Sequence, residues 1–120
     1  MKKRIFVEKG GIFDVESPKI FSEIKTIVPH IQDVKVYNIY DLFGIEENEL
    51  NKVIFNTFVD PVVDILHTEN PAENLHFATE FLPGQYDQRA DSAQQCIALL
   101  TENENSTVRS GKLIELFGVT

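Results

Sequence analysis

The polar residues best placed to do chemistry lie between positions 82 and 96, where the sequence reads Leu-Pro-Gly-Gln-Tyr-Asp-Gln-Arg-Ala-Asp-Ser-Ala-Gln-Gln-Cys. Pro83-Gly84 predicts a turn, because proline presets its φ and glycine tolerates a positive φ. Asp87 can then cap a helix, with its carboxylate facing the unpaired N–H groups of the first turn. A helix start can also receive a phosphate, but Asp87 already occupies this one and only Arg89 is basic nearby. The stretch therefore predicts hydrogen bonding at a helix start.

Catalytic and metal-binding patterns are missing from the rest of the sequence. Cys96 lies inside the same predicted helix beside its apolar face, whereas a catalytic thiol needs a nearby base and a lowered pKa. His30, His67 and His76 are scattered without the spacing of zinc ligands, and residues 102–106 resemble a calcium loop only in composition. Glycine-rich nucleotide motifs and Gly-x-Ser-x-Gly do not occur. We predict no catalytic residue, no metal site and no cofactor in this chain, so a cysteine hydrolase is the weakest function considered.

A binding surface explains the polar stretch better than a reaction centre does. Its side chains are hydrogen-bonding groups gathered at one helix start, without a nucleophile and its base. We predict that they form a protein interface, made by Gln85, Tyr86, Asp87, Gln88, Arg89 and Asp91.

Composition limits the partners and the compartment. The chain has 120 residues and a formal net charge of −8, which suits one domain and argues against a nucleic-acid surface. A single cysteine suits a reducing compartment. No apolar run approaches the roughly 20 residues that span a bilayer, and the charged N-terminus differs from a secretory signal. We expect a cytoplasmic protein without nucleic-acid or membrane partners.

Hydrophobic periodicity predicts strands at about residues 4–9, 34–42, 62–67, 75–82 and 107–117. It predicts helices from Ser17, as N-cap, to Pro29, from about 46 to 58, and from Asp87 to about Thr101. In the second strand Val34, Val36, Tyr40 and Leu42 share one face, and Lys35, Tyr37, Ile39 and Asp41 share the other. Asn38 falls on the apolar face, which leaves the register open. Gly111 indicates a bulge or a close approach of another chain segment.

The element order is β-α-β-α-β followed by β-α-β, a unit of about seventy residues whose second copy stops early. The first unit spans about 1–70 and the second about 74–120, within one domain of residues 1–120. We expect negligible residue identity between the two copies. The predicted fold class is α+β, with a mostly antiparallel sheet and helices packed on one face.

Residues 82–96 resemble the N-terminal, PurS-like domain of phosphoribosylformylglycinamidine synthase (FGAM synthase), in the large single-chain form found in clostridia. Residues 3–9, residues 40–45 and Val108-Arg109 resemble it in the same order and spacing. The resemblance covers nearly the whole chain. It implies a fold similar to a fused pair of PurS subunits, each of them β-α-β-α-β.

The same resemblance implies a role in purine biosynthesis. The full enzyme is a ligase and amidotransferase that uses ATP, magnesium and glutamine-derived ammonia. This domain would link the synthetase and glutaminase domains and help to form the ammonia channel, without being catalytic alone. The sequence departs from the family in two ways: no synthetase or glutaminase sequence is present, and the second unit lacks its last helix and strand. We therefore expect a fragment of a longer enzyme that self-associates as a dimer through uncovered sheet surface.

One other function stays open on the sequence. Units of the β-α-β-α-β type also serve as small-molecule sensors, so the chain is alternatively a free-standing regulatory module that binds a metabolite.

Overall fold

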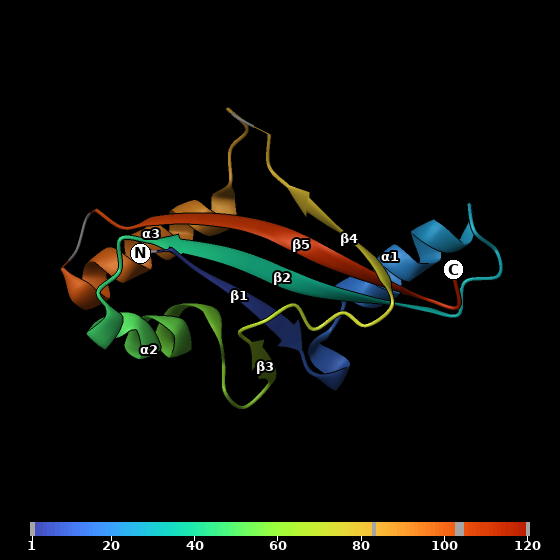
Figure 1. The fold of residues 1–120 in the computed structure, drawn as a ribbon, viewed down its shortest axis with the longest axis horizontal. Coiled ribbons are helices and arrows are strands. Elements are labelled where there is room, and N and C mark those ends of the chain that lie inside the picture. Colours follow the sequence, from blue (N-terminus) through green and yellow to red (C-terminus); the bar gives the residue numbers. More distant parts are fainter. Residues whose placement is uncertain (1, 83, 103–104, 120) are drawn as a thin grey trace.

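The computed structural model describes residues 2–82, 84–102 and 105–119, so predictions that rest on Pro83, Asn103 and Glu104 lie outside the described residues. Within these ranges five antiparallel strands form one sheet in the order β3-β1-β2-β5-β4 (Figure 1). The strands are β1 (Lys2–Lys9), β2 (Asp33–Phe43), β3 (Asp64–His67), β4 (Leu75–Glu80) and β5 (Thr107–Phe117). The helices are α1 (Glu16–Lys25), α2 (Leu50–Val53) and α3 (Gln88–Thr101). The predicted fold class and element order are confirmed.

Several element ends differ from the prediction for local reasons. Helix α1 begins at Glu16, because Asp14 Oδ1 accepts the Ser17 N–H at 3.0 Å and takes the capping role expected of Ser17. Strand β3 begins only at Asp64, since the N–H groups of Val63 and Asp64 both donate to the Asp60 carbonyl in a turn. Strand β4 ends at Glu80. The predicted second helix contains α2, flanked by a 3₁₀ turn (Glu47–Glu49) and a π turn (Ile54–Phe58).

The two longest strands, β2 and β5, pair along their whole lengths at the centre of the sheet, from Asp33 opposite Phe117 to Phe43 opposite Thr107. Their ends repeat in sequence, since Leu42-Phe43-Gly44 matches Leu116-Phe117-Gly118. Both glycines have a positive φ, 74° and 82°. This match of three residues leaves the identity between the copies low. The match is short and confined to one strand end, which is why the element order showed the repeat before the residues did.

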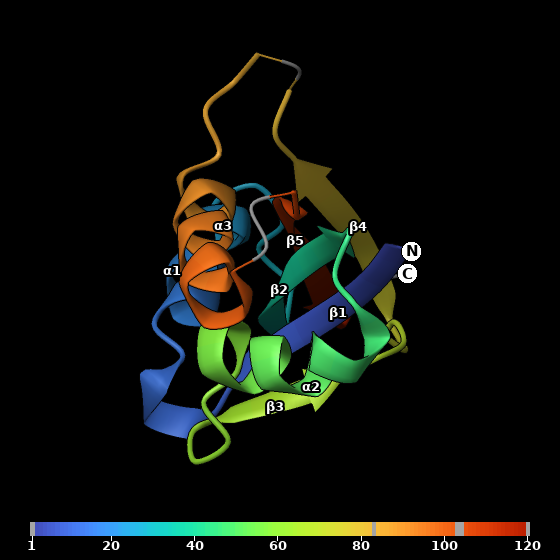
Figure 2. The same cartoon turned by 90° about the vertical axis from the view of Figure 1, so that its left-hand side faces the viewer.

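All three helices cover one face of the sheet, as predicted. Helices α2 and α3 pack over one half of this face and α1 packs over the other half (Figures 1 and 2). The strand residues buried beneath the helices are Ile5, Val7, Val34, Val36, Tyr40, Leu42, Val108 and Ile114. Asn38 lies on this same face and is buried, and its Oδ1 has no hydrogen-bond partner. Its place settles the register that the sequence left open.

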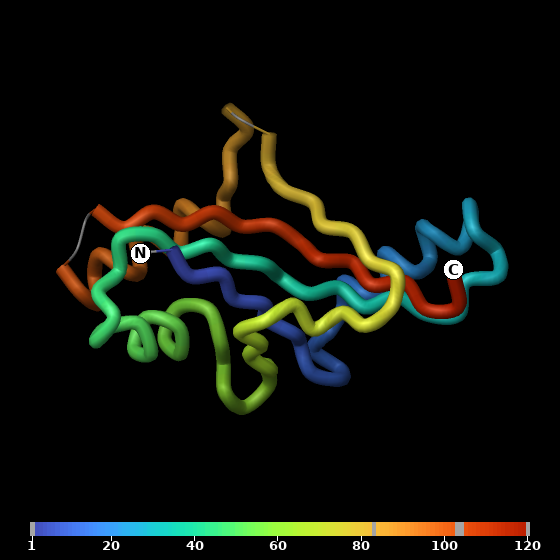
Figure 3. Tube along the Cα trace, viewed as in Figure 1, coloured from blue at the N-terminus to red at the C-terminus, as the bar shows by residue number. Residues whose placement is uncertain are grey.

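The second face is covered by the connection between β3 and β4, residues 68–74, which crosses the sheet from one edge to the other (Figure 3). Ala72 in this connection packs on Phe6, Tyr37, Ile39 and Leu113, which are all buried. The sequence pattern assigned Tyr37 and Ile39 to this face of β2 but did not indicate that they would be buried. An alternating pattern could not show that a loop would bury the second face.

Glu115 fastens that connection to the sheet. Its Oε2 accepts the N–H groups of Glu73 and Asn74 and the Asn74 side-chain amide at 2.9–3.0 Å, and its Oε1 accepts the Tyr37 hydroxyl at 3.0 Å. Burial raises the pKa of Glu115, but these four hydrogen bonds outweigh burial and lower the pKa below its usual value. Burial and the neighbouring Glu115 raise the pKa of Tyr37. A charged Glu115 therefore stabilises the loop.

Candidate functional site: the arm and the start of helix α3

Residues 81, 82 and 84–87, called the arm, leave the sheet after β4 and project beyond it before the chain returns at α3 (Figures 1 and 2). Gly84 has a φ of 84°, which is consistent with the predicted turn. The Gln85 N–H donates to the Leu82 carbonyl and Gln85 Oε1 accepts the Leu82 N–H, both at 2.9 Å. Two reciprocal bonds therefore close the arm, and both involve Gln85, a predicted interface residue.

Asp87 joins the arm, the helix and the central strand. Its Oδ1 accepts the Ala90 N–H at 3.0 Å, which confirms the predicted cap of α3. The same carboxylate accepts the Ser110 hydroxyl at 2.7 Å and the Ser110 N–H at 2.8 Å. Strand β4 has turned away from β5 at this point, so Asp87 replaces a ladder partner for β5. Asp87 therefore connects the end of the arm and the start of α3 to β5.

A second helix side chain does the same and was missed in the sequence. Gln94 Oε1 accepts the N–H of Val108 at 2.8 Å, and Val108 lies two residues before Ser110 on β5. In the sequence Gln94 is one of several polar residues of the stretch 82–96, without a role of its own. The available signal was its spacing: Asp87 and Gln94 lie seven residues apart, and residues two turns apart share one face of a helix.

The other predicted interface residues lie together around the helix start. The Tyr86 hydroxyl donates to Asp91 Oδ2 at 3.1 Å, and that hydrogen bond raises the pKa of Tyr86. Gln95 donates to the same oxygen at 3.1 Å. Arg89 is exposed and donates to the Tyr40 hydroxyl at 3.3 Å, and Gln88 is exposed. The structure thus brings all six predicted residues into one region.

Solvent-exposed apolar side chains lie beside these polar groups. Leu82 is 72% exposed and Tyr86 is 68% exposed, both on the arm. On β4 every residue is exposed, including Leu75 and Phe77, which point toward the helix-bearing side but have no helix above them. Together with Phe81, which is 41% exposed, they form an apolar strip from β4 to the arm that is interrupted by Thr79. Such a strip next to polar groups is typical of a protein-binding surface.

Two hollows flank the arm. One, of about 450 Å3, is lined by arm and helix residues that include Gln85, Tyr86, Gln88 and Arg89. The other, of about 610 Å3, lies between the arm and the ends of β1, β2 and β5, where Arg4 and Arg109 flank Asp41. Arg4 makes two hydrogen bonds of 2.7 and 2.8 Å to Asp41, and these bonds lower the pKa of Asp41. The carboxylate of Asp41 is therefore already neutralised.

The remaining candidate residues do not join a reaction centre. The Thr57 hydroxyl donates to Cys96 Sγ at 3.4 Å, in a half-buried position between α3 and the π turn. His67 contacts Glu8 Oε1 at 2.9 Å and His76 contacts the Asn74 carbonyl at 2.8 Å. Among the described residues, no three or more His, Cys, Asp or Glu side chains gather where a metal ion could be held. Gly111 is a close-approach point, since a Cβ there would lie 2.5 Å from the Thr79 carbonyl oxygen.

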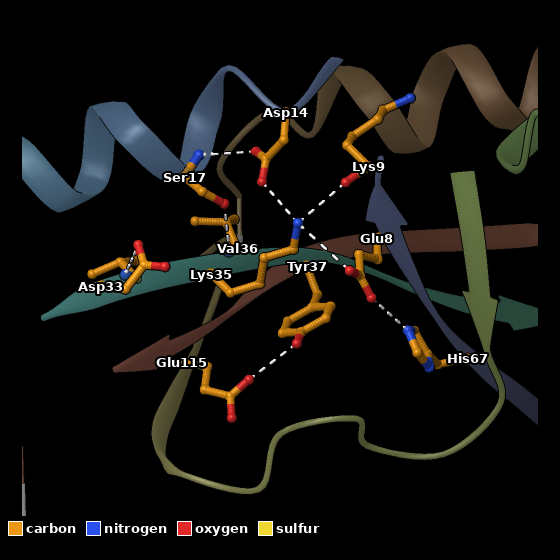
Figure 4. Close-up of polar contacts among 11 residues, drawn as sticks. Glu8, Lys9, Asp14, Ser17, Asp33, Lys35, Val36, Tyr37, His67 and Glu115 are labelled. Atoms are coloured by element: carbon orange, nitrogen blue, oxygen red, sulfur yellow. Dashed lines mark hydrogen bonds and ion pairs between the residues drawn. The ribbon is translucent and has the colours of Figure 1, made fainter. Parts of the chain in front are cut away.

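A second polar cluster lies at the other end of the sheet, where β1 leaves β2 (Figure 4). Lys35 Nζ contacts Asp14 Oδ2 at 2.9 Å, the Lys9 carbonyl at 3.1 Å and Glu8 Oε2 at 3.6 Å. Burial raises the pKa of Asp14, but hydrogen bonds from Ser17 and Lys35 outweigh it and lower the pKa. These contacts hold the start of α1 against the sheet. The Lys35, Asp14 and Glu8 side chains all make hydrogen bonds or ion pairs here, so they form no reaction centre.

The fold and the site define a small α+β domain with a projecting arm as its candidate binding surface. No protein-family model, curated protein or solved structure matches the chain. None of the helices in the described ranges is both long enough and apolar enough to cross a membrane.

Proposed function

We propose that this chain is the N-terminal scaffold domain of a phosphoribosylformylglycinamidine synthase, acting in the cytoplasm in purine biosynthesis. It binds the synthetase and glutaminase domains and helps to form the route for ammonia, while ATP and magnesium bind elsewhere in the full enzyme. One observation carries the proposal: the stretch that resembles the family, residues 82–96, builds a projecting arm with exposed Leu82 and Tyr86. A stretch that carried out chemistry would instead point its polar groups into a reaction centre.

Binding to the rest of the enzyme tests this function. The chain is titrated by calorimetry with a separately expressed synthetase–glutaminase portion of a clostridial FGAM synthase. We expect saturable binding that the double variant Leu82→Ser, Tyr86→Ser weakens at least tenfold. Leu99→Ser is the matched control, because Leu99 is 86% exposed in the last turn of α3 and lies outside the arm. Undetectable binding of the unaltered chain contradicts the proposal.

Self-association belongs to the same proposal. The outer edge of β4 carries no neighbouring strand in the described structure, and its exposed Leu75 and Phe77 lie beside it. Open edges and apolar faces promote pairing between chains. Sedimentation velocity over a hundredfold concentration range should show a monomer–dimer equilibrium that Phe77→Lys shifts toward monomer. A monomer at all concentrations contradicts this part.

The alternative, a regulatory module that binds a small molecule, is favoured by the hollow of about 450 Å3 beside Tyr86 and Arg89. A thermal-shift screen of nucleotides, amino acids and purine intermediates tests it. A stabilising compound whose effect disappears in Arg89→Ala would support this function, and a screen without any hit would count against it.

A further inference from the structure

In each copy of the repeat the outer strand leaves its partner before the partner ends. This leaves part of β2 without β1 and part of β5 without β4, and we call these two places the first and second gaps. Strand β1 leaves β2 after Val7 pairs with Asn38, and β4 leaves β5 one residue after Thr79 pairs with Lys112. Val7 and Thr79 are each followed by a glutamate. In both copies the departing strand leads to an aspartate whose Oδ1 accepts the N–H three residues on, at 3.0 Å in each case. The gaps can therefore be compared residue by residue.

The first gap is filled by an ammonium group from the chain itself. Lys35 Nζ lies within 2.9 Å of Asp14 Oδ2, 3.1 Å of the Lys9 carbonyl and 3.6 Å of Glu8 Oε2 (Figure 4). A lysine ammonium has three donors, and these three oxygens surround it. The first copy thus shows what the gap is built to hold.

The second gap keeps both carboxylates of the first, but its cation points elsewhere. The counterparts of Glu8, Lys9, Asp14 and Lys35 are Glu80, Phe81, Asp87 and Arg109. Arg109 turns away across the sheet, with its Cζ 6.0 Å from the centre of the Phe43 ring. The hollow of about 610 Å3 lies at this place and is lined by all four counterparts. Glu80, Asp87 and Arg109 keep the charges of Glu8, Asp14 and Lys35, whereas Phe81 stands where the first copy has Lys9.

Charge in the second gap favours a cation. Arg4 pairs with Asp41 through two hydrogen bonds and is also attracted by Glu80, so in this gap the two arginines Arg4 and Arg109 face three carboxylates and the formal net charge is −1. Asp87 already accepts three hydrogen bonds, and a carboxylate has about four acceptor sites. One acceptor site of Asp87, the Glu80 carboxylate and the Phe81 carbonyl therefore remain for a donor with the geometry of Lys35.

We propose that the second gap receives a lysine side chain from a partner polypeptide that docks on the arm. Its ammonium takes the place that Lys35 takes in the first gap, held by Glu80, Asp87 and the Phe81 carbonyl. The partner being a polypeptide rests on the proposed function, whereas the ammonium specificity rests on the internal comparison. The exposed Leu82 and Tyr86 stand next to the gap and would contact the residues that flank the lysine.

A peptide titration tests the occupant. The ¹⁵N-labelled chain is titrated at low salt with acetyl-Ala-Ala-Lys-Ala-Ala-amide, and the amide shifts of Ser110 and Gly111 are followed. We expect shifts at least fivefold larger than with the peptide in which norleucine replaces lysine, and loss of that difference in Glu80→Gln. Glu23→Gln, an exposed acid on α1, is the control and should change nothing. Equal shifts from both peptides, or an unaltered lysine effect in Glu80→Gln, overturn the proposal.

Butylamine separates a polypeptide from a free amine. It carries the same ammonium, so shifts as large as those of the lysine peptide would overturn the polypeptide occupant. Smaller shifts support it.

A variant that supplies the ammonium from within gives a second readout. Arg109→Lys places a lysine at the position of Lys35, and we expect it to raise the urea midpoint and to abolish the peptide shifts. Adding Glu80→Gln should remove the gain in midpoint, as Glu8→Gln should lower the midpoint in the first copy. A midpoint in Arg109→Lys that does not depend on Glu80 counts against the proposal. None of these measurements uses the synthetase or glutaminase, so they can fail while the scaffold function holds.

Discussion

The first and second copies of the repeat bury equivalent strand positions to very different extents. Ile5 on β1, opposite Tyr40, is 0% exposed under α2 and α3, whereas its counterpart Phe77 on β4, opposite Ile114, is 44% exposed. Strand β1 has β3 on its outer edge, and β4 has no described neighbour there. The first copy therefore supplies most of the core, and the second copy supplies the exposed apolar strip and the arm.

The largest expected difference between the copies is in core truncation. Ile5→Ala should lower the free energy of unfolding by about 3–4 kcal/mol, because it leaves a cavity in a closed core. Phe77→Ala should cost about 1 kcal/mol, since much of its ring already contacts water. Urea unfolding of both variants at low concentration measures this. Equal costs would mean that β4 is covered in solution, and repeating the experiment at several concentrations would show whether a second copy covers it.

The two aspartates at the helix starts should differ next. Asp87→Ala removes a helix cap and leaves the Ser110 N–H and hydroxyl without their acceptor, so we expect a loss of about 2–3 kcal/mol. Asp14→Ala should cost about 1 kcal/mol, because the Lys35 ammonium can turn toward water. Thermal and urea unfolding of both variants give the comparison. Asp87→Asn, which can still cap the helix, should fall between them, and a harmless Asp87→Ala would contradict the proposed ladder role.

Acid should release the connection over the second face. Glu115 has a lowered pKa in the folded chain, so the unfolded chain binds more protons and Glu115 contributes stability above its ordinary value of 4.5. That contribution is lost as the pH falls through the folded pKa. Glu115→Gln should cost about 1–2 kcal/mol at neutral pH and should flatten the stability profile below pH 4.5. An unchanged acid limb in this variant would show that other carboxylates control it.

The smallest difference is expected at the repeated glycines. Alanine at either Gly44 or Gly118 meets a positive φ, and each substitution should cost about 1 kcal/mol. Gly44→Ala should be slightly worse, because its Cβ would meet the Asn105 backbone carbonyl at 3.2 Å, whereas at Gly118 the obstacle is the movable side chain of Gln32. Differential scanning calorimetry can rank the two. A larger cost at Gly118 would show that Gln32 is held in place.

The local signals in the sequence were sufficient for the fold class, the element order and the cap of α3. Asp87 followed by an apolar helical period gave the start of α3 to the residue. The end of β4 at Glu80 and the burial of Tyr37 and Ile39 could not be predicted from the sequence, because both depend on where distant segments lie. Asp87 reaches Ser110, and residues 68–74 cover β2, through contacts that no local pattern encodes.

The sequence grouped the residues of the candidate site, but it did not show which side chains bond within the chain and which face solvent. The sequence grouped six polar residues at one helix start, and the structure places Asp87 and Asp91 in internal hydrogen bonds while Gln88 and Arg89 remain exposed. The apolar part of the surface was not recognised, since Leu82 and Phe77 belong to a segment that looks like an ordinary buried strand. Exposure is a property of the assembled sheet and not of the strand alone.

The central pairing of β2 with β5 has a consequence for how the chain folds. These strands are far apart in sequence, and neither copy can complete its sheet until both are present. Contacts between distant residues require a long loop to close before they stabilise the chain, which slows folding. We therefore expect the two copies to fold in one kinetic step, with the Asn38–Lys112 pair at the middle of the central ladder forming together with the rest. A cut between β3 and β4 would then yield two pieces that fold only when mixed.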